Sequence, residues 1–307
     1  MGTPDFAVGI LDAIYKSNFE IVGVVTAPDK PAGRGQKVST SAVKEYALKS
    51  NLYLLQPTNL KDLPFLEELK KLNATIQVVV AFRMLPEVVW KMPLLGTFNL
   101  HASLLPEYRG AAPINWAIIN GESKTGVTTF FIDDKIDTGA IILKKETPIY
   151  ENETVGQLHD RLMNLGKEAV LETLNLVEKR KVKLVMQDDS KALKTAYKLN
   201  KENCKIDWSK PGLQIFNLIR GLNPYPAAWT FFNDGVNEWN VKLFEVVFVE
   251  KKHNYEIGTI EIFKKELYIY TLDGFLNVKS LQMPGKKKMQ TVELLNGIHF
   301  SEKIRAK

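Results

Sequence analysis

Asn99 and His101 stand two residues apart, directly after the apolar segment Leu94–Phe98, which is typical of a short β-strand. Side chains alternate along a strand, so this spacing places an amide and an imidazole on the same face. Further along the chain, Asp137 in the sequence Asp137-Thr138-Gly139 can supply a carboxylate. An amide, an imidazole and a carboxylate together can polarise a carbonyl group and move a proton. The sequence therefore predicts a catalytic site made of Asn99, His101 and Asp137.

These residues must be positioned by the first part of the chain, which alternates β-rich runs with helical ones. The strands that we expect there lie at 19–27, 52–56, 74–82, 127–132 and 141–148. The run 74–82 is nearly all apolar, which is typical of a strand in a parallel sheet covered by helices. Helices are expected at 7–17 and 40–50, and a long one opens at the capping box of Thr154 and Gln157 and ends near residue 180.

The fold class predicted for residues 1–180 is therefore α/β, a doubly wound, Rossmann-like domain with a mostly parallel sheet. Ligands of such open sheets bind at the carboxyl ends of the strands. The turn after His101 falls at such an end, which supports a catalytic role for this histidine over a purely structural one.

A change of pattern after residue 180 predicts a second domain, as the length of 307 residues also suggests. Residues 181–203 form a basic linker, and residues 204–307 contain one short helix at 214–220 followed by short β-segments. The strands expected in this part lie at 229–232, 241–249, 258–263, 266–271 and 276–281. Short strands at this spacing predict a small OB-like β-barrel.

Several classes of protein and site are disfavoured by the composition. A single cysteine, Cys204, allows no internal disulfide and fits a reducing cytoplasm. We find no apolar run long enough to span a membrane and no signal peptide, so a cytoplasmic protein without a membrane anchor is expected. The four histidines are dispersed, so no metal site is predicted, and Walker, GxGxxG and nucleophile-elbow motifs are absent.

The charge is distributed unevenly along the chain. Residues 1–178 carry a net charge of −3, whereas residues 179–307 carry +9. Because Lys and Arg side chains that neutralise phosphates release counterions, a basic C-terminal third favours a polyanionic partner. Two loops concentrate positive charge, and their basic residues are Lys30, Arg34 and Lys37 in the first and Lys286, Lys287 and Lys288 in the second. The alternative interpretations are a solvated lysine-rich surface for the C-terminal third, a flexible surface loop for the first loop and a solvated hairpin tip for the second.

Taken together, five segments resemble the folate-dependent formyltransferase family, and the resemblance spans essentially the whole chain. The segments are Met1–Ala7, Lys30–Lys37, Asn99–Pro113, Asp137–Gly139 and Ile219–Pro226. The motif around His101 is shared by the wider family. The loop Lys30–Lys37 and the C-terminal barrel narrow the resemblance to the methionyl-tRNA formyltransferases.

The resemblance implies a role for each group of residues. Asn99, His101 and Asp137 match the catalytic residues of the family. The matching tetrahydrofolate-binding residues are Ser103, Leu104, Leu105 and Pro106, and backbone contacts to the pterin ring are implied for Arg83, Met84 and Leu85. The loop that carries Arg34 matches the family's reader of the tRNA acceptor end.

The implied reaction transfers a formyl group from 10-formyltetrahydrofolate to the α-amine of initiator methionyl-tRNA, for translation initiation, without a metal. A sugar-nucleotide N-formyltransferase with the same Asn-His-Asp site is an alternative, although it leaves the loop Lys30–Lys37 and the basic barrel unexplained. A third possibility, from another class, is an RNA-binding protein on a relic enzyme fold. We expect a monomer.

Two features depart from the family pattern. Met1–Ala7 is similar to the turn and helix entry that follow a first strand, so we expect that about five residues of this strand are missing from the sequence. Ala140 stands where many relatives have an acidic residue, so no role is assigned to that position.

Overall fold

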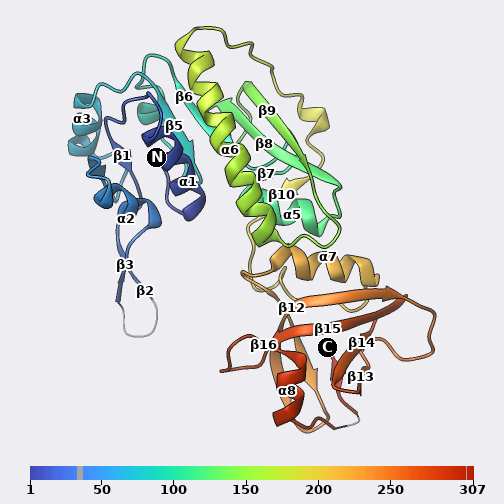
Figure 1. The fold of residues 1–307 in the computed structure, drawn as a ribbon. Coiled ribbons are helices and arrows are strands. Elements are labelled where there is room, and N and C mark those ends of the chain that lie inside the picture. Colours follow the sequence, from blue (N-terminus) through green and yellow to red (C-terminus); the bar gives the residue numbers. More distant parts are fainter. Residues whose placement is uncertain (33–36, 302) are drawn as a thin grey trace. The chain divides into compact units, whose positions relative to one another are not determined.

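The computed structural model describes residues 1–32, 37–301 and 303–307. Arg34, one of the basic residues singled out above, lies outside the described residues. The chain divides into two compact units, coloured along the sequence in Figure 1. The first unit comprises residues 1–113, 125–148 and 159–195, and the second comprises residues 114–124, 149–158 and 196–307.

Short parallel strands form the framework of the first unit. β1 (Val24–Val25) pairs in parallel with β4 (Leu54–Leu55), and β5 (Gln77–Val80) pairs in parallel with β6 (Thr97–His101). β8 (Lys124–Phe131) then runs antiparallel to β6, and β9 (Ile141–Pro148) completes the order β5-β6-β8-β9. The mostly parallel, doubly wound sheet predicted from the sequence is confirmed.

Met1 and Gly2 join the two parallel pairs. The Gly2 N–H donates to the Val25 carbonyl at 3.0 Å, and the Val80 N–H donates to the Met1 carbonyl at 2.9 Å. Gly2 is also bridged in parallel to Val80. Strands β1, β4, β5 and β6 thus run in the same direction, and their carboxyl ends lie along one edge of the sheet. The segments that follow these four strands are therefore the ones in a position to build a site.

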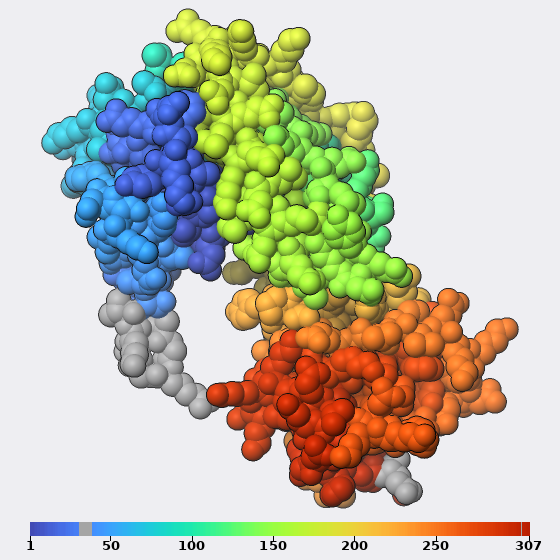
Figure 2. Space-filling model, viewed as in Figure 1, coloured from blue at the N-terminus to red at the C-terminus, as the bar shows by residue number. Residues whose placement is uncertain are grey.

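Helices cover this sheet, and the longest of them packs directly on the strand that carries the predicted site (Figure 1). α6 (Val155–Glu178) begins at the capping box of Thr154 and Gln157, as the sequence predicted, and its outer side is exposed (Figure 2). Gly166 lies so close to β6 that an added Cβ would be 2.8 Å from Leu100 Cδ2. The buried hydroxyls of Thr129 in β8 and Thr173 in α6 are hydrogen-bonded at 2.7 Å.

The remaining elements of the first unit include helices that the sequence pattern did not reveal. α1 (Asp5–Tyr15) and α2 (Ala42–Lys49) were expected, whereas α3 (Leu63–Lys71) and α4 (Glu87–Trp90) were not. The 3₁₀ helix η1 (Asp189–Lys191) lies in the segment that was predicted to be a linker, and residues up to Thr195 belong to the first unit.

Several expected strands differ in length from those observed. The strand expected at 19–27 forms ladder pairs only at Val24–Val25, with Leu54–Leu55 of β4. The strand expected at Leu94–Phe98 begins at Thr97, because a turn closed by Gly96, with φ +87°, precedes it. In the basic loop, β2 (Lys30–Ala32) and β3 (Lys37–Ser39) form an antiparallel ribbon.

The second unit contains an antiparallel barrel, as expected. Its strands are β11 (Ala228–Asn233), β12 (Glu238–Glu250), β13 (Ile260–Phe263), β14 (Glu266–Tyr270), β15 (Gly274–Gln282), β16 (Met289–Gln290) and β17 (Arg305–Ala306). They are ordered β13-β14-β15-β12-β11-β17, with β16 on β15. The Ala306 N–H donates to the Gly258 carbonyl at 2.7 Å, so β17 also meets the segment before β13 and the sheet closes on itself. Helices α5 (Pro113–Ile119), α7 (Gly212–Leu222) and α8 (Thr291–Gly297) complete the described helices.

One motif that carried the family resemblance, Ile219–Pro226, has a structural task in the second unit. Arg220 is buried at the end of α7 and donates to the side-chain oxygen of Asn217 at 2.8 Å and to the carbonyl of Glu153 at 3.0 Å. A buried guanidinium needs such acceptors, because burial without hydrogen bonds is costly. Arg220 thereby joins α7 to the segment 149–158 of the same unit.

Candidate active site

His101 lies at the last position of β6 and uses one of its ring nitrogens to bind the backbone. Its Nε2 is 2.8 Å from the carbonyl oxygen of Tyr108, which can only accept, so Nε2 carries a hydrogen and donates it. The other nitrogen, Nδ1, lies 3.8 Å from Oδ2 of Asp137. The two side chains are 7% and 13% exposed. Nδ1 is therefore the nitrogen that is available for chemistry, and Asp137 lies beside it, as the family resemblance implied.

Both residues that face the two nitrogens of His101 have left-handed backbones. Tyr108 has φ +62° and Asp137 has φ +56°. Such conformations cost free energy for a residue with a Cβ and persist only where surrounding contacts hold them. The Tyr108 N–H donates to the Lys194 carbonyl at 2.7 Å, and the Gly110 N–H donates to Oδ2 of Asp137 at 2.9 Å. The loop 108–110 therefore holds His101 and Asp137 at the same time.

Asn99 occupies the middle of β6, between Val79 of β5 and Phe130 of β8 in the ladder. Its Oδ1 atom is buried and has no hydrogen-bond partner among the described residues. A buried amide atom without a partner is unfavourable, and such atoms in native proteins need an explanation. Asn99 lies two residues before His101 on the same strand, so its Oδ1 can accept a hydrogen bond from a bound molecule.

The turn Ser103–Pro106 is fixed to the neighbouring strands by polar contacts. Ser103 is fully buried and its hydroxyl donates to the Glu107 carbonyl at 2.7 Å, which makes it a poor nucleophile. The Thr128 hydroxyl donates to the Ser103 carbonyl at 2.7 Å and accepts from the Leu105 N–H at 3.2 Å. Lys144 of β9 donates to the Leu105 carbonyl, and burial lowers the pKa of this lysine. Leu104 and Pro106 are half-buried.

Arg83, Met84 and Leu85 follow β5 at the same edge of the sheet, and each has a different environment. Leu85 is buried in the core of the first unit, whereas Met84 is 69% exposed. The Arg83 guanidinium donates to the carbonyls of Pro57 and Thr58, at 2.7 Å in the latter case. It thereby reaches the segment that follows β4.

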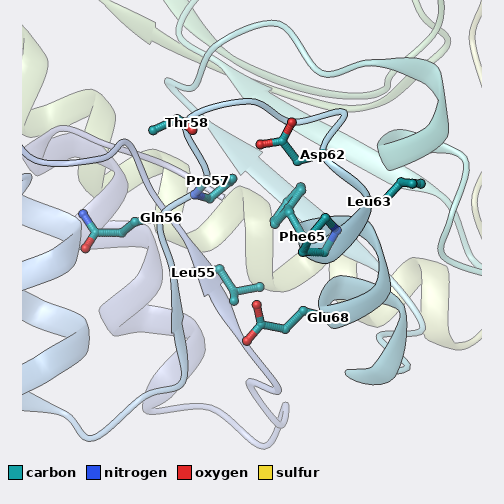
Figure 3. A pocket seen from close by; sticks show the side chains of 9 residues that line it. Leu55, Gln56, Pro57, Thr58, Asp62, Leu63, Phe65 and Glu68 are labelled. Atoms are coloured by element: carbon teal, nitrogen blue, oxygen red, sulfur yellow. The ribbon is translucent and has the colours of Figure 1, made fainter.

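A shallow pocket lies beside this contact, between the segment after β4 and helix α3 (Figure 3). Its volume is about 600 Å³, and it is lined by Leu55, Gln56, Pro57, Thr58, Asp62, Leu63, Pro64, Phe65 and Glu68. A pocket of this size is in the range that holds small molecules and cofactors. Because it adjoins the residues bound by Arg83, it lies next to one of the segments that the resemblance assigned to the pterin ring.

The basic residues singled out from the sequence differ in how free their charges are. Lys30 is exposed, and Lys37 lies in β3. Lys286 and Lys287 are exposed in the turn between β15 and β16. Lys288 is instead paired with Glu245 at 2.8 Å and lies over the ring of Phe244 at 5.0 Å, so part of its charge is already neutralised.

Neither a cluster of metal ligands nor a membrane-spanning helix is found among the described residues. Residues 1–32, 37–301 and 303–307 contain no group of three or more His, Cys, Asp or Glu side chains that could hold a metal ion. Within the same ranges, no helix combines the length and the apolar character needed to cross a membrane.

Comparison with known proteins decides the family. Residues 1–174 match the family described as Formyl transferase, and residues 198–299 match its C-terminal domain. The chain belongs to the formyl transferase family. A Methionyl-tRNA formyltransferase of Flavobacterium johnsoniae is 65% identical over 99% of this chain and 97% of its own. One of Bacteroides fragilis is 50% identical over 100% of this chain and 96% of its own.

Solved structures of formyl transferases share the fold. An N-formyltransferase from Helicobacter canadensis, in complex with folinic acid and dTDP-3-aminofucose, superposes with a TM-score of 0.66 over 94% of this chain and 97% of its own, at 23% identity. HypX from Aquifex aeolicus, in complex with tetrahydrofolic acid, has a TM-score of 0.60 over 81% of this chain and 43% of its own, at 19% identity. At these identities the likeness concerns the fold. The family and the fold predicted from the sequence are thus confirmed, while the roles of the site residues stay predictions.

Three residues around the site were missed by the sequence analysis. Tyr108 acts through its backbone carbonyl, for which the sequence contains no signal beyond its place in the motif. Lys144 lies on β9, where alternation marked it only as a polar position. Gln187 lies in the lysine-rich segment after α6, and the sequence analysis considered only the charged residues of that segment. Its neutral side chain contacts the backbone of Asp137.

Gly139 can be tested as a constraint on the Asp137 turn. An added Cβ would lie 1.7 Å from the Phe131 carbonyl oxygen, so Gly139→Ala forces the turn away from β8. We expect the variant to lower the free energy of unfolding by about 1–3 kcal/mol, the usual effect of overpacking. Denaturant titrations measure this change. Gly297→Ala is the control, because nothing lies within 4 Å of its added Cβ. Equal stability of both variants would contradict the observed packing of the turn.

Proposed function

We propose that this chain transfers the formyl group of 10-formyltetrahydrofolate to the α-amine of methionine on initiator tRNA, the reaction that prepares this tRNA for translation initiation. The observation that carries the proposal is the His101–Asp137 pair at the end of β6, with the buried, unpaired acceptor Oδ1 of Asn99 on the same strand. The 65% and 50% identity to proteins named Methionyl-tRNA formyltransferase, over nearly the full length of each, supports the choice of acceptor.

In the proposed mechanism, the neutral amine attacks the formyl carbon directly. A new C–N bond forms, and the electron pair of the carbonyl π bond moves to its oxygen. The Nδ2–H group of Asn99 and a protonated His101 donate hydrogen bonds to that oxygen. Because Nε2–H is already bound to the Tyr108 carbonyl, the donor of the imidazolium is Nδ1–H. Collapse of the tetrahedral intermediate breaks the bond between carbon and the folate nitrogen.

Asp137 manages the charges and the proton in this scheme. Its carboxylate, 3.8 Å from Nδ1, stabilises the imidazolium electrostatically. The separation is too long for a direct hydrogen bond, so a water molecule can bridge the two groups. The proton lost by the attacking amine passes to the leaving nitrogen through Asp137, directly or by way of water. The scheme requires no covalent enzyme intermediate.

We assign the folate to the carboxyl edge of the first unit. The residues proposed to hold it are Ser103, Leu104, Leu105, Pro106, Arg83, Met84 and Leu85. The turn Ser103–Pro106 is immobilised by Thr128 and Lys144, and such preorganisation lowers the entropic cost of binding. Arg83 links the segment after β5 to the wall of the pocket next to β4.

The tRNA is assigned to the basic loops. The residues proposed to contact phosphates are Lys30, Arg34, Lys37, Lys286, Lys287 and Lys288. Exposed lysines without an acidic partner are best suited to this task, because nothing in the protein neutralises them. A sugar-nucleotide acceptor is less well supported, because the sugar N-formyltransferase from Helicobacter canadensis is 23% identical and shares the fold alone.

Replacing the three proposed catalytic residues tests the mechanism. We expect Asn99→Ala and His101→Ala each to reduce the rate of formyl transfer to charged initiator tRNA by about 10²–10³, because each removes one donor to the oxyanion. Asp137→Ala loses activity as well, since the proton relay and the charge beside His101 disappear. Formyl transfer from labelled donor is measured, and circular dichroism checks the fold.

The exposed His299 gives a matched control, and His299→Ala should keep the wild-type rate. Near-wild-type turnover of any of the three variants removes that residue from the mechanism. An amino-sugar nucleotide, assayed in parallel, distinguishes the two acceptors. Faster transfer to the sugar than to the tRNA would overturn the proposal.

Salt dependence tests the assignment of the tRNA. We expect the affinity for initiator tRNA to fall steeply with rising salt, and each phosphate contact removed to reduce the slope of log K against log salt by about 1. Lys286→Ala and Lys287→Ala should show this reduction, and Lys288→Ala a smaller one because Glu245 already pairs with it. Lys16→Ala, which only breaks an ion pair with Asp12, is the control. A salt-independent affinity would contradict phosphate binding.

A further inference from the structure

Gln187 is a half-buried amide whose four hydrogen-bonding positions are all used near the candidate site. Its Nε2 donates to the carbonyls of Asp137 and Gly139, each at 2.9 Å. Its Oε1 accepts from Nε and from a terminal nitrogen of the Arg109 guanidinium, at 3.1 and 2.7 Å. A flipped amide would place donors against donors and acceptors against acceptors, so these partners fix its orientation.

The two segments that Gln187 joins are the ones that hold His101. Asp137 faces Nδ1 of His101, and Arg109 directly follows Tyr108, whose carbonyl accepts from Nε2. The same two segments are linked by the bond from the Gly110 N–H to the Asp137 carboxylate. Gln187 therefore forms a second link between the two segments, from the Arg109 side chain to the carbonyl groups of Asp137 and Gly139.

The position of Gln187 is itself set by backbone pairing within the first unit. The Ile141 N–H donates to the Val185 carbonyl at 2.8 Å, and the Val185 N–H donates back at 3.0 Å. This pair aligns the segment after α6 with the start of β9, next to the turn at Asp137–Gly139. Val185 is apolar but exposed. The segment after α6 is therefore held here by main-chain hydrogen bonds and not by burial of this side chain.

We propose that Gln187 is a positioning residue that keeps the Asp137 carboxylate beside Nδ1 of His101. The left-handed backbone of Asp137 lacks intrinsic stability, and its carbonyl and that of Gly139 gain their acceptor bonds from this one amide. Without the amide, the turn is free to relax to another backbone conformation. The carboxylate then moves away from the imidazole, although neither catalytic side chain has changed.

Two substitutions separate the two ends of the amide. Gln187→Met has a similar length and removes all four hydrogen bonds, whereas Gln187→Glu keeps an acceptor for Arg109 and removes the donors to Asp137 and Gly139. If donation to the two carbonyls is what matters, both variants lose function to a similar extent. Asp189→Asn is the control, because Asp189 is the exposed second partner of Arg109, at 2.9 Å, and does not contact the Asp137 turn.

The kinetic role rests on the proposed function, so wild-type formyl transfer is measured alongside the variants. We expect kcat of Gln187→Met and Gln187→Glu to fall about 10- to 100-fold, the usual effect of a misplaced catalytic group, with KM for both substrates unchanged. In an Asp137→Asn background, Gln187→Met should cause no further loss, because it acts through a group already removed. Asp189→Asn should match the wild type.

A second readout does not depend on any acceptor. Hydrogen exchange of the Gly110 amide, which donates to the Asp137 carboxylate, should be faster in both Gln187 variants and unchanged in Asp189→Asn. Unchanged Gly110 exchange together with wild-type kcat would overturn the proposal, as would a fully additive loss in the Asp137→Asn background. If the wild type fails to formylate charged initiator tRNA, the proposed function is wrong, and the exchange measurement alone still decides the positioning role.

Discussion

The hydrogen bond from His101 Nε2 to the Tyr108 carbonyl is the contact on which the candidate site depends. A carbonyl accepts and never donates, so this bond fixes which nitrogen carries a hydrogen in the neutral ring. It also turns Nδ1 toward Asp137. To present its carbonyl in this way Tyr108 adopts a left-handed backbone, and the Lys194 carbonyl holds its N–H in place. The unfavourable backbone conformation of Tyr108 thus fixes the tautomer of the His101 imidazole.

The sheet explains why this loop meets the other parts of the site. Because β1, β4, β5 and β6 run in the same direction, the segments after them leave the sheet along one edge. These segments are the basic ribbon, the pocket wall, the Arg83 segment and the turn Ser103–Pro106. β8 and β9 then return Asp137 to the end of β6. Loops that are far apart in the sequence can therefore contribute together to binding the formyl donor and the acceptor and to transferring the proton.

The sequence predicted what depends on local pattern. The alternation of Asn99 and His101, the apolar run of β5 and the capping box at Thr154 each reflect neighbours along the chain, and the fold followed from them. The approach of Asp137 to His101 could not be derived in this way, because it depends on backbone atoms of Tyr108 and Gly110 and on the amide of Gln187 far along the chain. The pairing of Lys288 with Glu245 is likewise a contact between two strands that charge counting cannot reveal.

The most direct test of this account is the tautomer of His101. Nitrogen-15 NMR of the labelled protein, with the ring signals assigned through His101→Gln, distinguishes the two nitrogens at a pH where the ring is neutral. The structure predicts a protonated Nε2 and an unprotonated Nδ1. A neutral ring that carries its hydrogen on Nδ1 would contradict the account. In that tautomer Nε2 could not donate to the Tyr108 carbonyl, and Nδ1 would not be the unprotonated nitrogen beside Asp137.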